Sequence, residues 1–189
     1  YVISGGNNIT EWHFLDANQP NNSLTLIQPR QEDFEYDVED HGEHFMIRNN
    51  GDGAKDFKIS QTPIENPLKE NWTDFYHYQP GRIIQTILLF QDYLVVSIRD
   101  KGLPKLEVIH LDSGTNQSIY FDEEDYNVRP QQGREWNTSV LRFSYASLTT
   151  PSTIFDYDMA NNSRELKKQT EVLAGFDSNL YASKRVLAP

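Results

Sequence analysis

The sequence predicts an all-β protein whose antiparallel strands follow one another along the chain. Short runs alternate apolar and polar residues with a period of two, which is the pattern of a strand with one buried face. β-branched and aromatic residues fill these runs, and the 189 residues include 10 Tyr, 10 Phe and 3 Trp. Clusters of Asn, Asp, Gly and Pro separate the runs, as expected of turns. Helical periodicity is almost absent.

Five runs show the strand pattern most clearly, and residues 34–39 are the clearest of them. One face of this run is apolar, and the other carries Glu35, Asp37 and Glu39, so we expect that face to be wet. The other four runs are residues 24–27, 44–48, 93–99 and 154–157. Turn signals lie at residues 5–8, 49–53 and 112–114.

A weak internal repeat divides the chain into similar pieces. Each piece has the form strand, polar turn, strand, polar turn, and the equivalent points are Ser4, Arg48, Arg99 and Tyr145. A repeat of roughly 40–50 residues with about four strands has the size of one β-propeller blade. We therefore expect a partial β-propeller of about four blades, each a four-stranded antiparallel meander. A β-sandwich is the alternative, because hairpins of similar spacing build both folds.

The repeat gives provisional blade limits. Three stretches fit strands poorly: 61–71 is expected to be a loop, 122–125 a solvated turn, and 164–169 helical, although 167–172 also suits an exposed last strand. The pattern ends after Leu173, so residues 173–189 are expected to be an exit linker. Within residues 1–172 the expected blades are 1–40, 41–90, 91–135 and 136–172.

Composition excludes several classes of function. The chain has no cysteine, so disulfide scaffolds and thiolate chemistry are excluded. A formal net charge of −11 argues against a nucleic-acid partner. No apolar stretch approaches the roughly 18–20 residues that cross a bilayer, so we expect no membrane partner. The first residue is Tyr1 and not Met, so we expect a piece of a longer protein.

Motifs for catalysis or metal binding are weak. No Gly-x-Ser-x-Gly pentapeptide and no phosphate-cradling glycine loop is present. His41 and His44, with Asp40 and Glu43 alongside, suggest a metal site, but a turn between strands is expected to splay the pair into solvent. We therefore expect no catalytic residue, no metal ligand and no cofactor, and the sequence names no substrate-binding residue. His13 and His77 are expected to be packed or edge residues, and His110 is the fifth histidine of the chain.

Two surface features remain. Residues 32–40 carry six carboxylates, which form either a solubilising face or a surface for cationic partners. Six Asn-x-Ser/Thr triplets are better explained by turn chemistry in a cytoplasmic or periplasmic bacterial protein than by glycosylation of a secreted one. The triplets begin at Asn8, Asn21, Asn71, Asn116, Asn137 and Asn161.

Several passages resemble the prolyl oligopeptidase family, in order along nearly the whole chain. The closest is 141–158, Leu-Arg-Phe-Ser-Tyr-Ala-Ser-Leu-Thr-Thr-Pro-Ser-Thr-Ile-Phe-Asp-Tyr-Asp, which favours the oligopeptidase B (protease II) branch. Residues 166–173 and 181–185 are similar to the passages that follow it, although Lys184 stands where the family usually has Glu. Earlier matches are residues 26–38 and 45–58.

The resemblance implies a serine oligopeptidase in which a seven-bladed propeller covers an α/β-hydrolase domain. In that family the propeller excludes folded proteins and admits short peptides, and oligopeptidase B cleaves after Arg or Lys. This chain would be the later blades, with residues 181–185 marking the crossing to the catalytic domain. No triad or specificity residue of the family can be carried over onto these positions.

Two other hypotheses stay open at this point. One is a stand-alone binding module of propeller or sandwich type, and the other is a Ca²⁺- or Zn²⁺-stabilised β domain. If the chain is an arc of blades, its unpaired strand edges predict self-association of the isolated piece.

Overall fold

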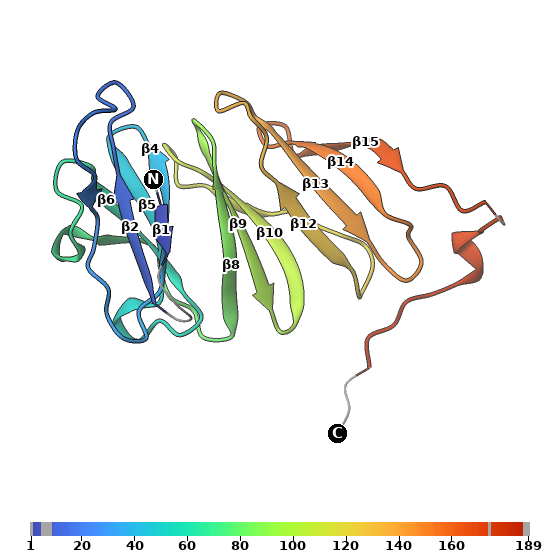
Figure 1. Cartoon of the computed structure of the whole chain (residues 1–189). Coiled ribbons are helices and arrows are strands. Elements are labelled where there is room, and N and C mark those ends of the chain that lie inside the picture. The colour runs from blue at the N-terminus through green and yellow to red at the C-terminus, as the bar shows by residue number, and fades with distance from the viewer. Residues whose placement is uncertain (1, 5–8, 174, 187–189) are drawn as a thin grey trace. The chain divides into compact units, whose positions relative to one another are not determined.

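The computed structural model describes residues 2–4, 9–173 and 175–186 (Figure 1). Across these residues the strands form four antiparallel sheets in which every strand pairs with its neighbour in sequence. The chain divides into two compact units, residues 1–84 and 85–189, which are described separately. No helix of the described residues has the length and apolar character needed to cross a membrane.

The first unit holds a three-stranded and a four-stranded sheet. The three-stranded sheet consists of β1 (Val2–Ser4), β2 (Thr10–Phe14) and β3 (Thr25–Leu26). The four-stranded sheet consists of β4 (Tyr36–His41), β5 (His44–Asn49), β6 (Lys58–Pro63) and β7 (Thr73–Tyr76). Two 3₁₀ turns, η1 (Gly51–Gly53) and η2 (Lys69–Asn71), lie in the connections that flank β6.

The second unit holds two four-stranded sheets, and the first strand of the earlier one begins just before the boundary between the units. The earlier sheet consists of β8 (Arg82–Leu89), β9 (Tyr93–Asp100), β10 (Leu103–His110) and β11 (Asn116–Ser118). The later sheet consists of β12 (Asn127–Gln131), β13 (Val140–Ala146), β14 (Thr153–Asp158) and β15 (Ser163–Gln169). A 3₁₀ turn, η3 (Ser178–Leu180), follows in the C-terminal segment.

The expected all-β meander is confirmed, but the sheets begin earlier than the blade limits drawn from the repeat. β4, β8 and β12 each pair with the strand that follows, so the sheets begin at Tyr36, Arg82 and Asn127. The reason is hydrogen bonding: β4 pairs with β5 across a two-residue turn, and a tight turn joins strands instead of separating sheets.

Two smaller expectations are also corrected. Residues 61–63 belong to β6, because Pro63 is the last residue of that strand, where its missing N–H costs little. The last strand runs over Ser163–Gln169 and is exposed along its length, so the exposed strand is confirmed over the helix, although it ends at Gln169 and not at residue 172.

Each unit has an apolar core between its two sheets. In the first unit Ile27, Phe34, Tyr36, Phe45 and Ile47 form the core, with Trp12 and Phe14 packed against it. In the second unit a larger cluster extends from Leu88 on β8 to Met159 after β14. Full burial of one such side chain is worth about 1.5–3 kcal/mol. Adjacent sheets packed through apolar faces are the arrangement expected of neighbouring propeller blades.

Two hairpin turns need positive φ angles. The β4–β5 turn places Gly42 at φ +67°, and the β9–β10 turn places Lys101 at φ +50° and Gly102 at φ +84°. Two successive positive φ values make the second a type I′ turn, whose twist matches that of the flanking strands. This turn lies at the end of the second unit to which the C-terminal segment returns.

Candidate functional site

The histidine pair that suggested a metal site closes a hairpin. His41 and His44 are opposed Cα partners at the end of β4 and β5, and His44 is exposed. Across the described residues no group of three or more His, Asp or Glu side chains is placed to hold a metal ion. The pair therefore supplies two possible ligands at most.

The remaining histidines lie in different environments. His13 is half-buried on β2, with Nε2 3.8 Å from Glu11 Oε1. His77 is exposed just after β7. The ring of His110 packs edge-to-face on Tyr93, with centroids 5.1 Å apart. These positions belong to three different sheets.

The acidic strand is less wet than the sequence predicts. Asp37 Oδ2 accepts a 2.7 Å hydrogen bond from Arg48 Nη1, whose side chain is only 12% exposed. Glu39 is half-buried, and burial together with the charge of Asp37 raises the pKa of its carboxyl. The face thus contains a structural ion pair and is not a simple solubilising surface.

The Asn-x-Ser/Thr triplets lie in turns and at strand ends. Asn161 Nδ2 donates to Asp158 Oδ2 at 2.6 Å within the β14–β15 turn, and Asn71 ends η2. Asn116 opens β11, and Asn8 lies outside the described residues. Two more, Asn21 and Asn137, are exposed. These places agree with the backbone explanation, and glycosylation stays untested.

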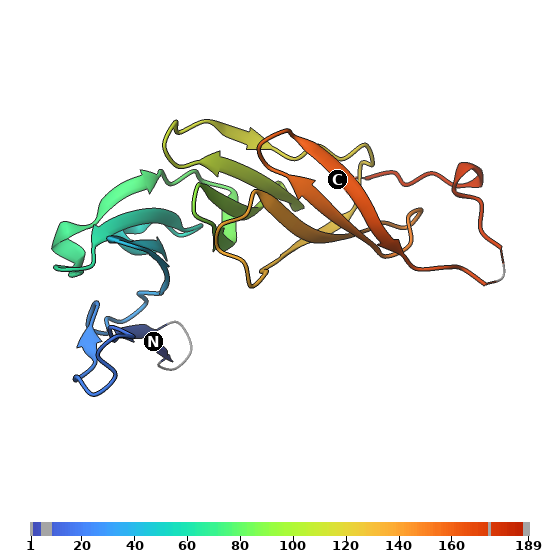
Figure 2. The same cartoon turned by 90° about the horizontal axis from the view of Figure 1, so that it is seen from above.

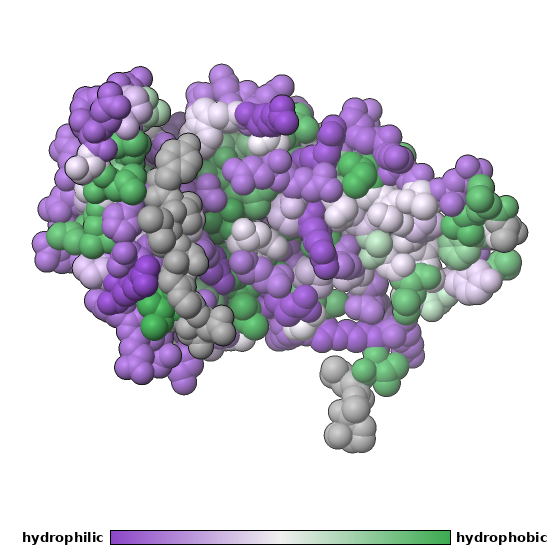
Figure 3. All heavy atoms as spheres, in the orientation of Figure 1, coloured by the Kyte–Doolittle hydropathy of each residue, from purple (hydrophilic) through white to green (hydrophobic). Residues whose placement is uncertain are grey.

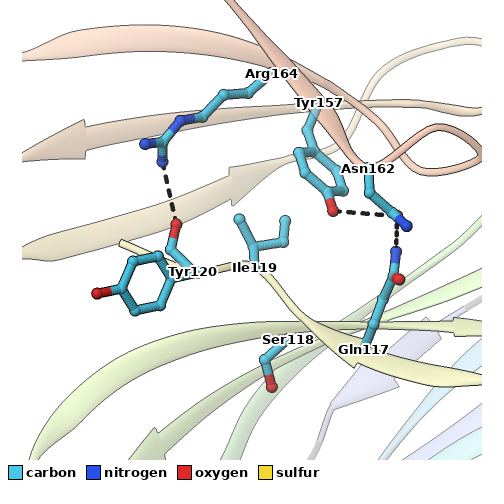
Figure 4. Close-up of a pocket in the computed structure, with 7 residues that line it drawn as sticks. All are labelled: Gln117, Ser118, Ile119, Tyr120, Tyr157, Asn162 and Arg164. Atoms are coloured by element: carbon cyan, nitrogen blue, oxygen red, sulfur yellow. Dashed lines mark hydrogen bonds between the residues drawn. The ribbon is translucent and has the colours of Figure 1, made fainter. Parts of the chain in front are cut away.

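A crevice of about 340 Å³ opens between β11 and the start of β15 (Figure 4). Tyr157 and Gln117 both donate toward Asn162 Oδ1, and Arg164 Nη1 donates to the Tyr120 carbonyl at 3.2 Å. The guanidinium of Arg164 also lies 5.7 Å from the Phe121 ring centroid. Because these polar groups satisfy one another, the crevice looks like a polar seam between two sheets and not a reaction centre.

A more organised polar site surrounds Glu123, in the connection between β11 and β12. Its carboxylate accepts hydrogen bonds from Tyr145 Oη at 2.5 Å, Thr149 Oγ1 at 2.6 Å and Thr150 Oγ1 at 2.9 Å. We call Glu123, Tyr145, Ser147, Thr149 and Thr150 the Glu123 cluster. Hydrogen bonds from hydroxyls to a carboxylate are short and stronger than neutral ones.

Local chain geometry explains how the cluster is presented. Ser147 Oγ accepts from the Thr149 amide at 3.0 Å, and the Ser147 amide donates to the Thr150 carbonyl at 3.0 Å. This hydroxyl-stabilised turn directs Thr149 inward, where it is 7% exposed, and leaves Leu148 83% exposed. Tyr145 reaches the same carboxylate from the end of β13.

Hydrogen bonds within the Glu123 cluster shift the pKa values of Glu123 and Tyr145. Burial alone would raise the pKa of Glu123, but the hydroxyls of Ser147, Thr149, Tyr145 and Thr150 together hold it below its ordinary value. Burial and the hydrogen bond to Glu123 raise the pKa of the Tyr145 phenol. Glu123 is therefore a stable anion at neutral pH, and its chemistry is that of an acceptor.

The C-terminal exit segment (residues 175–186) docks beside this cluster. It leaves the edge of the last sheet and turns back under the second unit (Figures 1 and 2). Ser183 Oγ lies 3.3 Å from Thr149 Oγ1, and the Arg185 amide donates to Glu124 Oε2 at 3.3 Å. The Arg185 guanidinium donates to the Lys101 carbonyl in the β9–β10 turn. Residues 183–185 thus contact connections or turns of both sheets.

Sequence reasoning missed this site. The sequence predicts one solvated turn over residues 122–125, which describes Asp122, with its 79% exposed side chain, but not the half-buried Glu123. Four consecutive acidic residues, 122–125, give no sequence signal that one of them is half-buried and makes a specific contact. The one available signal was the resemblance of 141–158 and 181–185 to family passages, because those passages contain the cluster's hydroxyls, Ser183 and Arg185.

Known proteins share this architecture. The family model described as "Prolyl oligopeptidase, N-terminal beta-propeller domain" matches residues 1–170. The chain belongs to the prolyl oligopeptidase family. This match confirms the family that the sequence resembled and places 1–170 in the propeller domain of that family.

Two relatives with different names match most of this chain. Dipeptidyl aminopeptidase BI of Pseudoxanthomonas mexicana is 33% identical over 166 residues, which cover 88% of this chain and 23% of that protein. Protease 2 of Moraxella lacunata is 27% identical over 188 residues, which cover 100% of this chain and 26% of that protein. The chain therefore spans about a quarter of the length of these relatives.

Solved structures of the family share the fold. Oligopeptidase B from Trypanosoma brucei, in a closed form with covalently bound antipain, matches with a TM-score of 0.86 and 27% identity over 91% of this chain and 26% of that one. Oligopeptidase B from Leishmania major matches with a TM-score of 0.84 and 28% identity, with the same coverage. These matches confirm the propeller prediction over the sandwich alternative.

Proposed function

We propose that this chain is the substrate-gating propeller part of a serine oligopeptidase. Its blades would cover an α/β-hydrolase domain carrying the Ser-Asp-His triad, so that short peptides enter and folded proteins are excluded. The observation that carries the proposal is the match of residues 1–170 to the family's propeller domain, together with the fold shared with two oligopeptidases B.

The exit segment supports a partner domain of the same protein. It exposes apolar side chains that water disfavours, and green spheres gather along it in Figure 3. Leu180 is 75%, Tyr181 61% and Val186 80% exposed. An apolar segment held against the second unit is suited to lie beneath a further packed domain, for which the catalytic domain is the natural candidate.

Short basic peptides are the substrate class that we propose. The net charge of −11 raises the local concentration of cationic peptides and speeds their encounter, an effect that salt screens. Bulk charge does not decide the cleaved bond, so cleavage after Arg or Lys rests on the oligopeptidase B likeness. The 33% identity to a dipeptidyl aminopeptidase favours a second candidate, removal of dipeptides from a free amino terminus.

The test compares the full-length protein with the isolated 189-residue chain. Two fluorogenic substrates separate the candidates: an amino-blocked peptide ending in Arg, and a dipeptide with a free amino terminus. We expect the full-length protein to hydrolyse the blocked Arg substrate and to be labelled by a fluorophosphonate, a reagent for activated serines. The isolated chain should do neither.

The other outcomes separate the alternatives. Hydrolysis of the free dipeptide alone would select the aminopeptidase activity. Hydrolysis and labelling by the isolated chain would contradict a purely gating role. A full-length protein without any peptidase activity would favour the stand-alone binding module.

A further inference from the structure

The exit segment is held by a chain of hydrogen bonds that ends on one carboxylate. Thr149 has a single hydroxyl proton, and Oγ1 donates it to Glu123 at 2.6 Å. The 3.3 Å contact between Thr149 and Ser183 therefore has Ser183 as its donor. Polarised chains of this kind strengthen one another when they end on an anion.

We propose that Glu123 is a positioning residue that latches the exit segment onto the propeller and so fixes where the chain leaves it. Glu123 orders Thr149, Thr149 receives Ser183, and the neighbouring Glu124 receives the Arg185 amide. The inference rests on the proposed function, in which the exit segment leads to the catalytic domain.

The β9–β10 turn, in the earlier sheet of the second unit, is a second anchor for the exit segment. The Arg185 guanidinium donates to the carbonyl of Lys101, and a Cβ added at Gly102 would lie 3.1 Å from Arg185 Nη2. A segment tied to both sheets resists rotation better than one tied to a single point. The latch thus restricts the direction of the exit as well as its position.

Hydrogen–deuterium exchange of the full-length protein tests the latch directly. The Arg185 amide donates to Glu124 outside the exit segment, so its exchange reports release of the segment, whereas the Leu180 and Tyr181 amides donate within the segment and report the η3 turn. Removing the ionic acceptor in Glu123→Ala should speed exchange in 176–186 by about tenfold or more, and removing one neutral bond in Ser183→Ala by about threefold. Asp122→Asn, an exposed neighbour, is the matched control and should leave exchange unchanged.

Activity provides the readout that a merely structural role would not give. Since the latch acts on domain placement and not on reacting atoms, Glu123→Ala should raise KM several-fold and leave kcat within about twofold. Glu123→Gln keeps one carbonyl acceptor for the threonines, so it should restore part of both effects. Ser183→Ala leaves the cluster intact and keeps the test valid if Glu123→Ala does not fold.

Two results would overturn the latch. One is exchange in 176–186 that stays at the level of Asp122→Asn in Ser183→Ala and in any folded Glu123→Ala protein. The other is an equal rise across β13 and β14, which would make Glu123 a general stabiliser of the sheet. A wild-type protein without peptidase activity would contradict the proposed function alone, because the exchange experiment does not depend on catalysis.

Discussion

At the scale of single residues, Tyr36 carries the contact between the two sheets of the first unit. The residue is fully buried, and its hydroxyl accepts from the Trp12 amide at 2.9 Å and donates to the Gln28 carbonyl at 2.7 Å. Its own carbonyl accepts from Trp12 Nε1 at 2.7 Å. Burial raises the pKa of this phenol, as expected for a hydroxyl that stays neutral inside the fold.

Tyr36→Phe should therefore be costly although it removes only one oxygen. It leaves a backbone donor and a backbone acceptor without their partner, which we expect to lower the free energy of unfolding by about 1–3 kcal/mol. Urea denaturation followed by tryptophan fluorescence measures the change. Tyr120→Phe is the control, because Tyr120 is 74% exposed and its variant should stay within about 0.5 kcal/mol of wild type. Equal stability of both variants would refute the role of the Tyr36 hydroxyl.

At the scale of elements, the glycines of two hairpin turns allow the cost of backbone strain to be distinguished from the effect of a side-chain contact. Gly42 and Gly102 both have positive φ, but an added Cβ meets nothing within 4 Å at Gly42 and meets the Arg185 guanidinium at Gly102. An L-residue in this region costs roughly 1–2 kcal/mol.

Alanine at either glycine should reduce stability by a similar amount, because the far end of an Arg side chain can move aside. Gly102→Ala alone should also speed hydrogen exchange in the exit segment, because it displaces Arg185. Urea unfolding and exchange mass spectrometry on the two variants measure both effects. Unchanged exchange in Gly102→Ala would show that the second anchor does not hold the segment.

The strands were predictable because their physics is local. A period of two and turn residues at fixed places locate β4, β5, β9 and β14 to within one or two residues. Sheet limits were less predictable, since the choice of partner depends on hydrogen bonds that single-strand patterns do not encode. Pro63 shows the difference, because a proline predicts a loop from sequence but is tolerated at the end of a strand.

The candidate site could not be predicted, because its contacts join residues far apart in sequence. Glu123 meets Thr149 at a separation of 26 residues, Thr149 meets Ser183 at 34, and Arg185 meets Lys101 at 84. Short-range patterns carry no information at those distances. Asp37 shows a similar limit, because the period of two places it on a wet face but does not predict its ion pair with the mostly buried Arg48.

At the scale of the whole molecule, the meandering sheets and the family match both assign residues 1–170 to a propeller domain. The last strand, β15, is exposed along its length, and Lys167 and Lys168 lie on this edge. Lysines on a free edge discourage pairing with other strands, so the self-association expected of an isolated arc stays a prediction.

If these sheets form a gate, as we propose, they restrict the size of the substrate. The most direct measurement is kcat/KM of the full-length protein for one Arg-containing sequence, presented as a short peptide and within a loop of a folded protein. A gating propeller predicts rapid cleavage of the peptide and a kcat/KM for the folded protein lower by at least about a hundredfold, which corresponds to about 2.7 kcal/mol. Comparable kcat/KM for the two substrates would contradict a gating propeller.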